Sequence, residues 1–282
     1  MDKRDGGDAK QKKRACFYVI CMTKHAERLA SASAIKTTLE SAAFSVTIID
    51  AVDGSKLDAA VLDKLARDGI VSAPNDDDGQ VHDMYDRPMR NSQFGCALSH
   101  MTAIRLIRDR QEEDYAVVFE DDVELVGDFE AKLDFMIKGM DAYPNDIDMI
   151  NLYMWPHDKL KLRVSERKVG DVIRMPMFGY FGTQCIMYRK SSASKIMRRI
   201  LPIRNPIDDH FATVGLKYFT ICNIDFVTHG KHDSSVGTNA STTNSNAHET
   251  LPASNSNNKA LPVSNSNNKA LPVSNNKIKR IL

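Results

Sequence analysis

Short apolar segments alternate with longer amphipathic ones along most of the chain, and this alternation predicts strands and helices in turn. The strand segments are rich in Val, Ile, Phe and Tyr, whereas in the helical segments apolar residues recur every three or four positions. The order strand, helix, strand favours right-handed crossovers and a mostly parallel sheet. Strands are predicted at residues 17–22, 46–49, 115–119, 147–152, 172–175, 184–188 and 218–224, and helices at 27–43, 57–67, 94–110, 128–140, 191–200 and 208–215.

The pattern also sets the predicted domain boundaries. Residues 1–14 form a basic, Gly-containing leader, and residues 15–236 carry the strand and helix pattern of one domain. Beyond residue 237, Asn, Ser and Thr replace large apolar residues, and a ten-residue unit beginning at Leu251 repeats at Leu261. This composition is typical of disorder, so residues 237–282 are predicted to be a low-complexity tail. The polar residues 71–92 form a long internal loop of the kind that often has a function.

Composition narrows the class of protein. The formal net charge of +1 gives no bulk attraction to nucleic acid, so no nucleic-acid partner is expected. No apolar run approaches the ~18–20 residues that a membrane-spanning helix needs. The five cysteines are scattered without a Cys-x-x-Cys pair, which is typical of reduced, buried thiols. A soluble, cytoplasmic protein is therefore expected; the oligomeric state stays open.

One apolar segment ends in three carboxylates. Residues 115–119 run directly into Glu120, Asp121 and Asp122. In an open α/β sheet, ligands bind beyond the carboxyl ends of the strands, and acids there can hold a divalent cation that in turn holds a diphosphate. A charged strand end without function is the plainer alternative. Strand alternation places Glu120 and Asp122 on one face and Asp121 on the other.

Five short motifs, in this order, resemble glycosyltransferase family 25, which includes bacterial lipooligosaccharide transferases and collagen galactosyltransferases. The resemblance spans roughly residues 16–236, and it depends on the order and spacing of the motifs more than on any one of them. The motifs are Tyr18-Val19-Ile20 with Glu27-Arg28, Ile49-Asp50-Ala51-Val52-Asp53-Gly54, Gly95-Cys96-Ala97-Leu98-Ser99-His100, Val118-Phe119-Glu120-Asp121-Asp122, and Pro206-Ile207-Asp208.

The resemblance implies a GT-A-like, Rossmann-type, doubly wound α/β domain that binds a nucleotide sugar and usually transfers the sugar with inversion. It also implies Mn²⁺ or Mg²⁺ at the acidic motif, where the cation would stabilise the charge of a departing UDP. Glu120 and Asp122 fit such a metal motif, with Asp122 the stronger candidate for a direct ligand. A further ligand is expected from His229 or His232 near the end of the domain, and Lys231 is placed to pair with a phosphate.

The remaining candidates concern the donor and the acceptor. An inverting transfer needs a base for the acceptor hydroxyl, and adjacent Asp208 and Asp209 after Pro206 suit that task, although an aspartate there is equally suited to capping a helix. Asp208 fits the family pattern better. The residues expected at the donor are Arg28, Asp50, Ser99, His100 and Asp121.

The sequence thus predicts a metal-dependent, inverting transferase that moves a sugar from a UDP-sugar to a hydroxyl of a glycan or glycoprotein. Two alternatives stay open. One is a binding or scaffold protein that keeps the fold without catalysis, and the other is a metal-dependent nucleotide-sugar hydrolase. The sugar, the linkage and the acceptor are not specified by the sequence.

Overall fold

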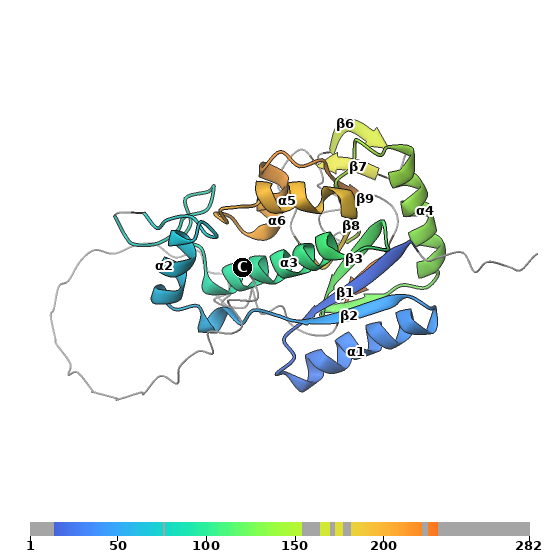
Figure 1. Ribbon diagram of the computed structural model, residues 1–282, viewed down its shortest axis with the longest axis horizontal. Coiled ribbons are helices and arrows are strands. Elements are labelled where there is room, and N and C mark those ends of the chain that lie inside the picture. The colour runs from blue at the N-terminus through green and yellow to red at the C-terminus, as the bar shows by residue number, and fades with distance from the viewer. Residues whose placement is uncertain are drawn as a thin grey trace, which may run out of the picture. The chain divides into compact units, whose positions relative to one another are not determined.

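The computed structural model describes residues 14–75, 77–153, 164–169, 173–176, 182–221 and 225–230, and the side chains of all of these except 164–169 and 173–176 (Figure 1). They lie within Met1–Val236, the first of the two units into which the chain divides. Most of the predicted leader and the whole predicted tail are outside the described residues. None of the helices in the described part has the length and apolar character needed to span a bilayer.

An eight-stranded mixed sheet forms the centre of the fold, with the strand order β2-β1-β3-β8-β5-β9-β7-β6. Strands β1, β2 and β3 pair in parallel, and β5 and β9 do the same, whereas β8 and β7 run against their neighbours. Two short strands, β4 and β10, pair separately. The bounds are β1 Ala15–Cys21, β2 Ser45–Asp50, β3 Tyr115–Glu120, β4 Val123–Leu125, β5 Met149–Asn151, β6 Val164–Val169, β7 Ile173–Pro176, β8 Cys185–Arg189, β9 Tyr218–Ile221 and β10 Val227–His229.

Helices cover both faces of this sheet. Helices α1 and α4 pack on the face that carries Phe17 and Phe119, and α3 lies on the opposite face, where it meets α5 and α6. This arrangement confirms the predicted doubly wound, mostly parallel α/β fold class. The helices are α1 Ala26–Ser41, α2 Ala59–Arg67, α3 Asn91–Asp109, α4 Phe129–Ala142, α5 Ala193–Arg199 and α6 Ile207–Thr213, with 3₁₀ turns at Gly54–Lys56 (η1) and Lys190–Ser192 (η2).

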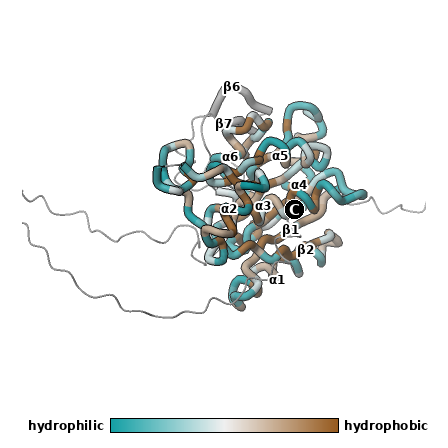
Figure 2. Tube along the Cα trace, turned by 60° about the vertical axis from the view of Figure 1, so that its left-hand side comes forward, coloured by the Kyte–Doolittle hydropathy of each residue, from teal (hydrophilic) through white to brown (hydrophobic). Residues whose placement is uncertain are grey.

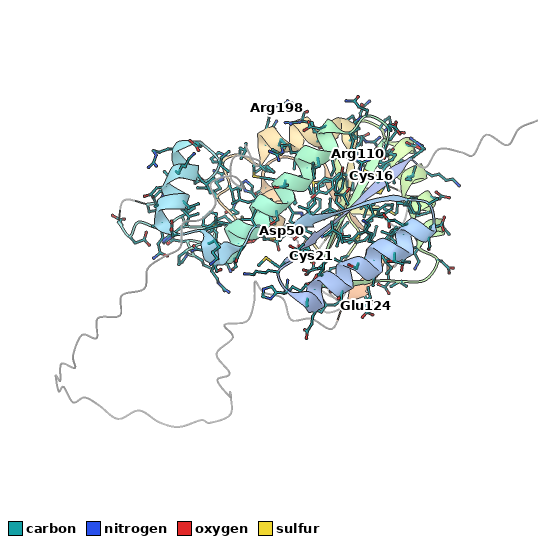
Figure 3. The ribbon with its side chains drawn as sticks, turned by 60° about the horizontal axis from the view of Figure 1, so that its bottom comes forward. Cys16, Cys21, Asp50, Arg110, Glu124 and Arg198 are labelled. Carbon is teal, nitrogen blue, oxygen red and sulfur yellow. The ribbon has the colours of Figure 1, made fainter. Side chains whose placement is uncertain are left out.

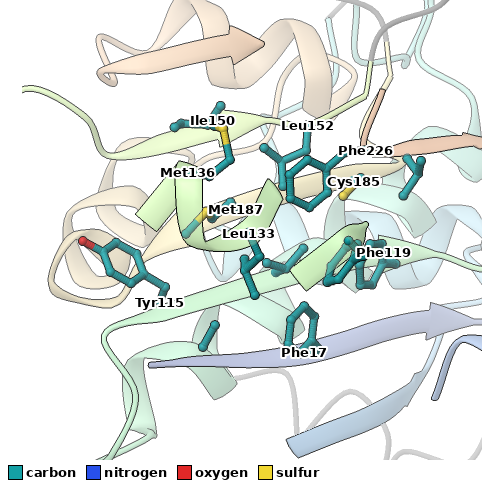
Figure 4. Close-up of a cluster of buried hydrophobic side chains, with 14 of the residues drawn as sticks. Phe17, Tyr115, Phe119, Leu133, Met136, Ile150, Leu152, Cys185, Met187 and Phe226 are labelled. Carbon is teal, nitrogen blue, oxygen red and sulfur yellow. The ribbon is translucent and has the colours of Figure 1, made fainter. Parts of the chain in front are cut away.

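The core follows from the two-residue period of the strands. Alternate residues of β1 and β3 face α1 and α4, and the Phe17 ring stacks on the Phe119 ring with their centroids 6.0 Å apart. Phe129 and Phe226 close this cluster in an edge-to-face pair with ring centroids 5.0 Å apart. Figure 4 shows Phe17, Phe119 and Phe226 in this cluster. Figure 2 shows hydrophobic residues gathered around β1 and α3 and hydrophilic ones along the outer loops. Burial of this cluster fixes the direction and register of β1 and β3, and therefore the position of their carboxyl ends.

Most predicted elements are present, with shifts of a few residues at their ends. The predicted helix 94–110 begins earlier, at Asn91, where the Arg90 N–H donates to the Gln93 side chain over 2.8 Å. Ser192 precedes α5 but does not cap it, because its hydroxyl donates to Asp148 over 2.8 Å. The predictions missed β4, β6 and β10, which are short or largely polar.

Candidate active site

The carboxyl ends of three parallel strands meet at one edge of the sheet. Cys21 lies opposite Asp50, and Ile20 lies opposite Glu120. Cys21 and Asp50 mark this edge in Figure 3, and Cys16 marks the other end of β1. The edge opens into a cavity of about 360 Å³, a size that suits a small-molecule ligand. Five of the predicted residues line it, namely Arg28, Ser99, His100, Glu120 and Asp121.

Glu120 is held from the α3 side of the cavity. Its carboxylate accepts hydrogen bonds from the Thr183 hydroxyl and, over 3.2 Å, from His100 Nε2. Burial raises the pKa of Glu120, but the hydrogen bonds and charges around it outweigh burial and leave this pKa below its usual value. Glu120 is therefore an ionised carboxylate in a fixed orientation, as a metal- or ligand-binding group must be.

Asp121 turns to the other side, as strand alternation predicts. Its Oδ2 accepts the Met22 N–H over 3.1 Å, and its Oδ1 accepts from Arg28 Nη1 over 3.1 Å. Both partners line the same cavity. The side chains of Arg28 and Asp121 are 18% and 5% exposed, so this ion pair is shielded from water. Arg28 thus joins α1 to the acidic motif and keeps its guanidinium at the cavity wall.

Asp122 is a buried carboxylate that lacks a hydrogen-bond partner for one of its oxygens among the described residues. It is 4% exposed, and its Oδ1 has no hydrogen-bond partner among the described residues. Burial and the charges of Glu120 and Asp121 raise the pKa of Asp122 to about 7. A buried carboxylate without a partner is costly, and a divalent cation would supply both the missing contact and the missing charge. Asp122 is therefore a candidate ligand for a divalent cation.

The strand pair β4/β10 brings the end of the domain back to this motif. His229 lies opposite Val123, and the Gly230 N–H donates to the backbone carbonyl of Asp122 over 2.6 Å. The His229 side chain is exposed. Lys231 and His232 lie outside the described residues. This pairing brings the backbone of His229 and Gly230 next to Asp122, and His229 or His232 stays the prediction for a third ligand.

Asp208 and Asp209 point in different directions from the start of α6. Asp208 accepts the Gly182 N–H over 2.9 Å. Burial, followed by the charges of Glu120, Asp208 and Asp122, raises the pKa of the half-buried Cys96 thiol. Burial, and to a smaller extent the charge of Glu120, raises the pKa of Asp208. Asp209 is 1% exposed, and burial together with the charge of Asp208 raises its pKa to about 6.

Comparison with known proteins identifies the family. A family model described as glycosyltransferase family 25 (LPS biosynthesis protein) matches residues 15–215, from β1 to the turn after α6. The chain belongs to glycosyltransferase family 25. No curated protein matches it. Two solved structures are among those that match it: A197 from STIV (12% identity, covering 76% of this chain and 83% of that chain, TM-score 0.39) and apo mouse xyloside xylosyltransferase 1 (11% identity, 71% and 81%, TM-score 0.34).

Two of the predicted donor residues of this family 25 chain also have structural partners. The Ser99 hydroxyl accepts the Val52 N–H over 2.8 Å and donates to the Gly95 carbonyl over 2.7 Å. Asp50 is exposed at the end of β2 and accepts from the Thr23 hydroxyl over 2.7 Å. Ser99 therefore shapes the cavity by fixing the segment after β2, and its hydroxyl has no free hydrogen to offer a ligand.

Two residues of the site, Cys96 and Thr183, were not among the predicted site residues, although Cys96 belongs to one of the quoted motifs. Cys96 lies one turn before His100 on α3, and potential ligand atoms of Cys96, His100 and Glu120 lie within 4.8 Å of one another. The spacing of Cys96 and His100 was a usable signal, because residues four apart share a helix face. Thr183 lies far from Glu120 in the sequence, and no local sequence pattern predicts the hydrogen bond between them.

Gly95 allows α3 to cross the segment after β2 at close range. A Cβ at this position would lie 2.7 Å from the Val52 carbonyl oxygen and 2.9 Å from the Gly54 nitrogen. Gly95→Ala is expected to lower the free energy of unfolding by about 1–3 kcal/mol, because the backbones must separate. Urea unfolding measures this. Gly127→Ala is the matched control, since nothing lies within 4 Å of a Cβ there. Equal midpoints for both variants would contradict this account of the crossing.

Proposed function

We propose that this chain transfers a sugar, with inversion at the anomeric carbon, from a UDP-sugar to a hydroxyl of a glycan or glycoprotein in a metal-dependent reaction. The observation that carries the proposal is the buried Asp122 Oδ1, which has no hydrogen-bond partner among the described residues. Asp122 directly follows Glu120 and Asp121, which line the cavity at the carboxyl ends of β1, β2 and β3. Membership of a glycosyltransferase family supports the reaction class. The UDP-sugar donor, the inversion at the anomeric carbon and the dependence on Mn²⁺ or Mg²⁺ belong to the proposal.

The donor would occupy the cavity between α1, the segment after β2 and α3. Asp122 and Glu120, with His229 or His232, would hold the cation, which neutralises charge on the diphosphate as it leaves. Arg28 lies at the cavity wall beside Asp121 and is suited to a phosphate oxygen. The 51–54 segment and Ser99 shape the wall that faces the nucleoside, and Asp50 stands at the same edge.

The acceptor would enter from the α6 side. Its hydroxyl oxygen forms a bond to the anomeric carbon while the bond from that carbon to the UDP oxygen breaks. Asp208 would take the hydroxyl proton. The hydrogen bond from the Gly182 N–H orients its carboxylate, and burial together with the charge of Glu120 raises its pKa, which suits a base. Asp209 points toward the 71–92 loop and would bind the acceptor instead.

The raised pKa values of the two aspartates predict how the rate depends on pH. Asp209 accepts a hydrogen bond from the acceptor hydroxyl best when ionised, so kcat/KM for the acceptor is expected to fall as pH decreases through about 6, where the Asp209 carboxyl gains its proton. The pKa of Asp208, the proposed base, is also raised, and protonation of this carboxyl lowers the rate in the same direction. The measurement is kcat/KM for the acceptor between pH 5 and 8 with saturating metal and donor. Circular dichroism at each pH shows that the protein stays folded. A flat profile over this range would contradict the assignment.

The proposed function is tested by UDP release. Purified protein is incubated with single UDP-sugars, with and without Mn²⁺, and released UDP is measured in the presence and absence of candidate glycans. We expect one donor to be turned over only with metal and faster with an acceptor. Rapid release that no acceptor alters would favour a hydrolase, and no release from any UDP-sugar would contradict the proposal.

A further inference from the structure

The hairpin 81–89 presents two exposed large apolar side chains in sequence. Met84 is 51% exposed and Tyr85 is 49% exposed, and among the described residues no other neighbouring pair of large hydrophobic residues is exposed to this degree. The hairpin closes through hydrogen bonds from Met89 N–H to the Val81 carbonyl and from Asp83 N–H to the Arg87 carbonyl, the latter over 2.8 Å. An exposed aromatic residue on such a closed hairpin requires an explanation other than packing.

Asp83 keeps this hairpin in one conformation. Its Oδ1 accepts the N–H groups of Tyr85 and Arg87 over 2.9 and 3.0 Å, and its Oδ2 binds the Arg87 guanidinium in a bidentate ion pair. The Arg87 guanidinium lies over the Tyr85 ring, 4.7 Å from its centroid. The ring is thereby oriented before any ligand arrives, which lowers the conformational cost of binding.

The hairpin is also fixed to the segment that carries the proposed base. The Met84 N–H donates to Asn205 Oδ1 over 2.7 Å, and Asn205 is 3% exposed just before α6. The charge of Asp209 is the largest influence that raises the pKa of Tyr85, and Arg87 and Asp83 in turn act on Asp209. The hairpin that carries Tyr85 is therefore joined to the segment just before α6, the helix whose first turn holds Asp208 and Asp209.

Asp209 offers an unused acceptor at this place. Its Oδ1 is buried and has no hydrogen-bond partner among the described residues. A carbohydrate ring presents an apolar face of C–H groups and a rim of hydroxyl donors. The exposed Tyr85 ring matches the apolar face, and the Asp209 carboxylate is an acceptor that matches the hydroxyl donors.

We infer that Tyr85 is the platform on which a pyranose ring of the acceptor stacks, with Asp209 accepting a hydroxyl of that sugar. The inference rests on the proposed function and narrows it, because it makes the acceptor a carbohydrate and not a hydroxylated side chain of a polypeptide. Arg87 and Asp83 are positioning residues that hold the ring at the proposed base.

The test compares Tyr85→Ala, Tyr85→Phe and Tyr143→Ala with the wild type. Tyr143 follows α4 and is 40% exposed, so its replacement removes a similar exposed ring elsewhere. The probes are methyl pyranosides and disaccharides of galactose, glucose and xylose, and acceptor KM is measured from UDP release. Stacking on an aromatic ring is worth about 1 kcal/mol or more, so Tyr85→Ala is expected to raise acceptor KM roughly tenfold. Tyr85→Phe and Tyr143→Ala are expected to stay within about twofold.

Metal-dependent UDP binding, measured by calorimetry on the same proteins, separates the possible outcomes. If UDP binds and Tyr85→Ala raises acceptor KM while Tyr85→Phe does not, the inference is supported. If UDP binds but Tyr85→Ala leaves acceptor KM unchanged, or if only a hydroxylysine peptide accelerates UDP release, the inference is overturned and the donor site stands. If the wild type binds no UDP, the proposed function itself fails.

Discussion

Asp122→Asn is expected to stabilise the metal-free protein while reducing sugar transfer by at least about 100-fold. Asp122 is buried next to Glu120 and Asp121, and its Oδ1 has no partner among the described residues. An asparagine of the same shape removes the charge that makes this burial costly. It also removes the ligand on which the proposed cation depends.

The sign of the stability change follows from the pKa. The pKa of Asp122 is raised to about 7 in the folded protein by burial and by the neighbouring carboxylates. The unfolded chain ionises this group near pH 4, so the folded state loses relative stability as pH rises from about 4 to about 7. Above pH 7 the full penalty applies, and Asp122→Asn is expected to recover part of it, on the order of 2 kcal/mol.

Urea unfolding at pH 8 with a chelator measures the first effect, and UDP release with Mn²⁺ measures the second. Mn²⁺ should stabilise the wild type but not the variant, because a ligand raises stability only where it binds the folded state. Asp134→Asn, on the exposed surface of α4, is the matched control. A destabilised variant that keeps its activity and its response to Mn²⁺ would contradict the metal assignment.

Asp208→Asn is expected to reduce transfer by about 10²–10⁴-fold while metal-dependent UDP binding is retained. The amide keeps the size of the side chain and an oxygen for the Gly182 N–H, but it cannot take the acceptor proton. The loss should appear in kcat, since the proposed arrangement puts the donor and the cation on the other side of the reacting carbon.

Asp209→Asn is the comparison that assigns the base. If Asp208 is the base and Asp209 binds the acceptor, Asp209→Asn should mainly raise acceptor KM. If Asp209→Asn instead abolishes kcat while Asp208→Asn retains most of it, the roles are reversed. Calorimetry with UDP and Mn²⁺ confirms in each case that the donor site is intact.

The sequence predicted the strand end at which the acidic motif lies. Apolar residues 115–119 made a buried strand evident, and a buried parallel strand ends at the edge of the sheet where ligands bind. Glu120 and Asp121 reach the cavity through that rule and the β1–β3 register, whereas Arg28 and Ser99, which also line it, were expected at the donor from the family resemblance.

The rest of the candidate site depends on contacts between segments that are far apart in the sequence. Thr183 reaches Glu120 because β8 is inserted antiparallel between β3 and β5, and no local pattern reveals the direction of a short buried strand. The pairing of β4 with β10, which places His229 beside the acidic motif, joins two three-residue strands that are too short to show a period. Tyr85 lies in a segment that the sequence predicted only as a loop. The hydrogen bonds that fix its position, from the Tyr85 N–H to Asp83 and from the Met84 N–H to Asn205, are not evident from the sequence.

The central claim is that Asp122 anchors a cation that binds a nucleoside diphosphate in this cavity. Isothermal titration calorimetry of UDP into wild-type protein and Asp122→Ala, each with Mn²⁺ and with a chelator, tests it most directly. The account predicts binding only for the wild type with Mn²⁺. Equal UDP binding by the variant, or binding that persists in the chelator, would contradict it.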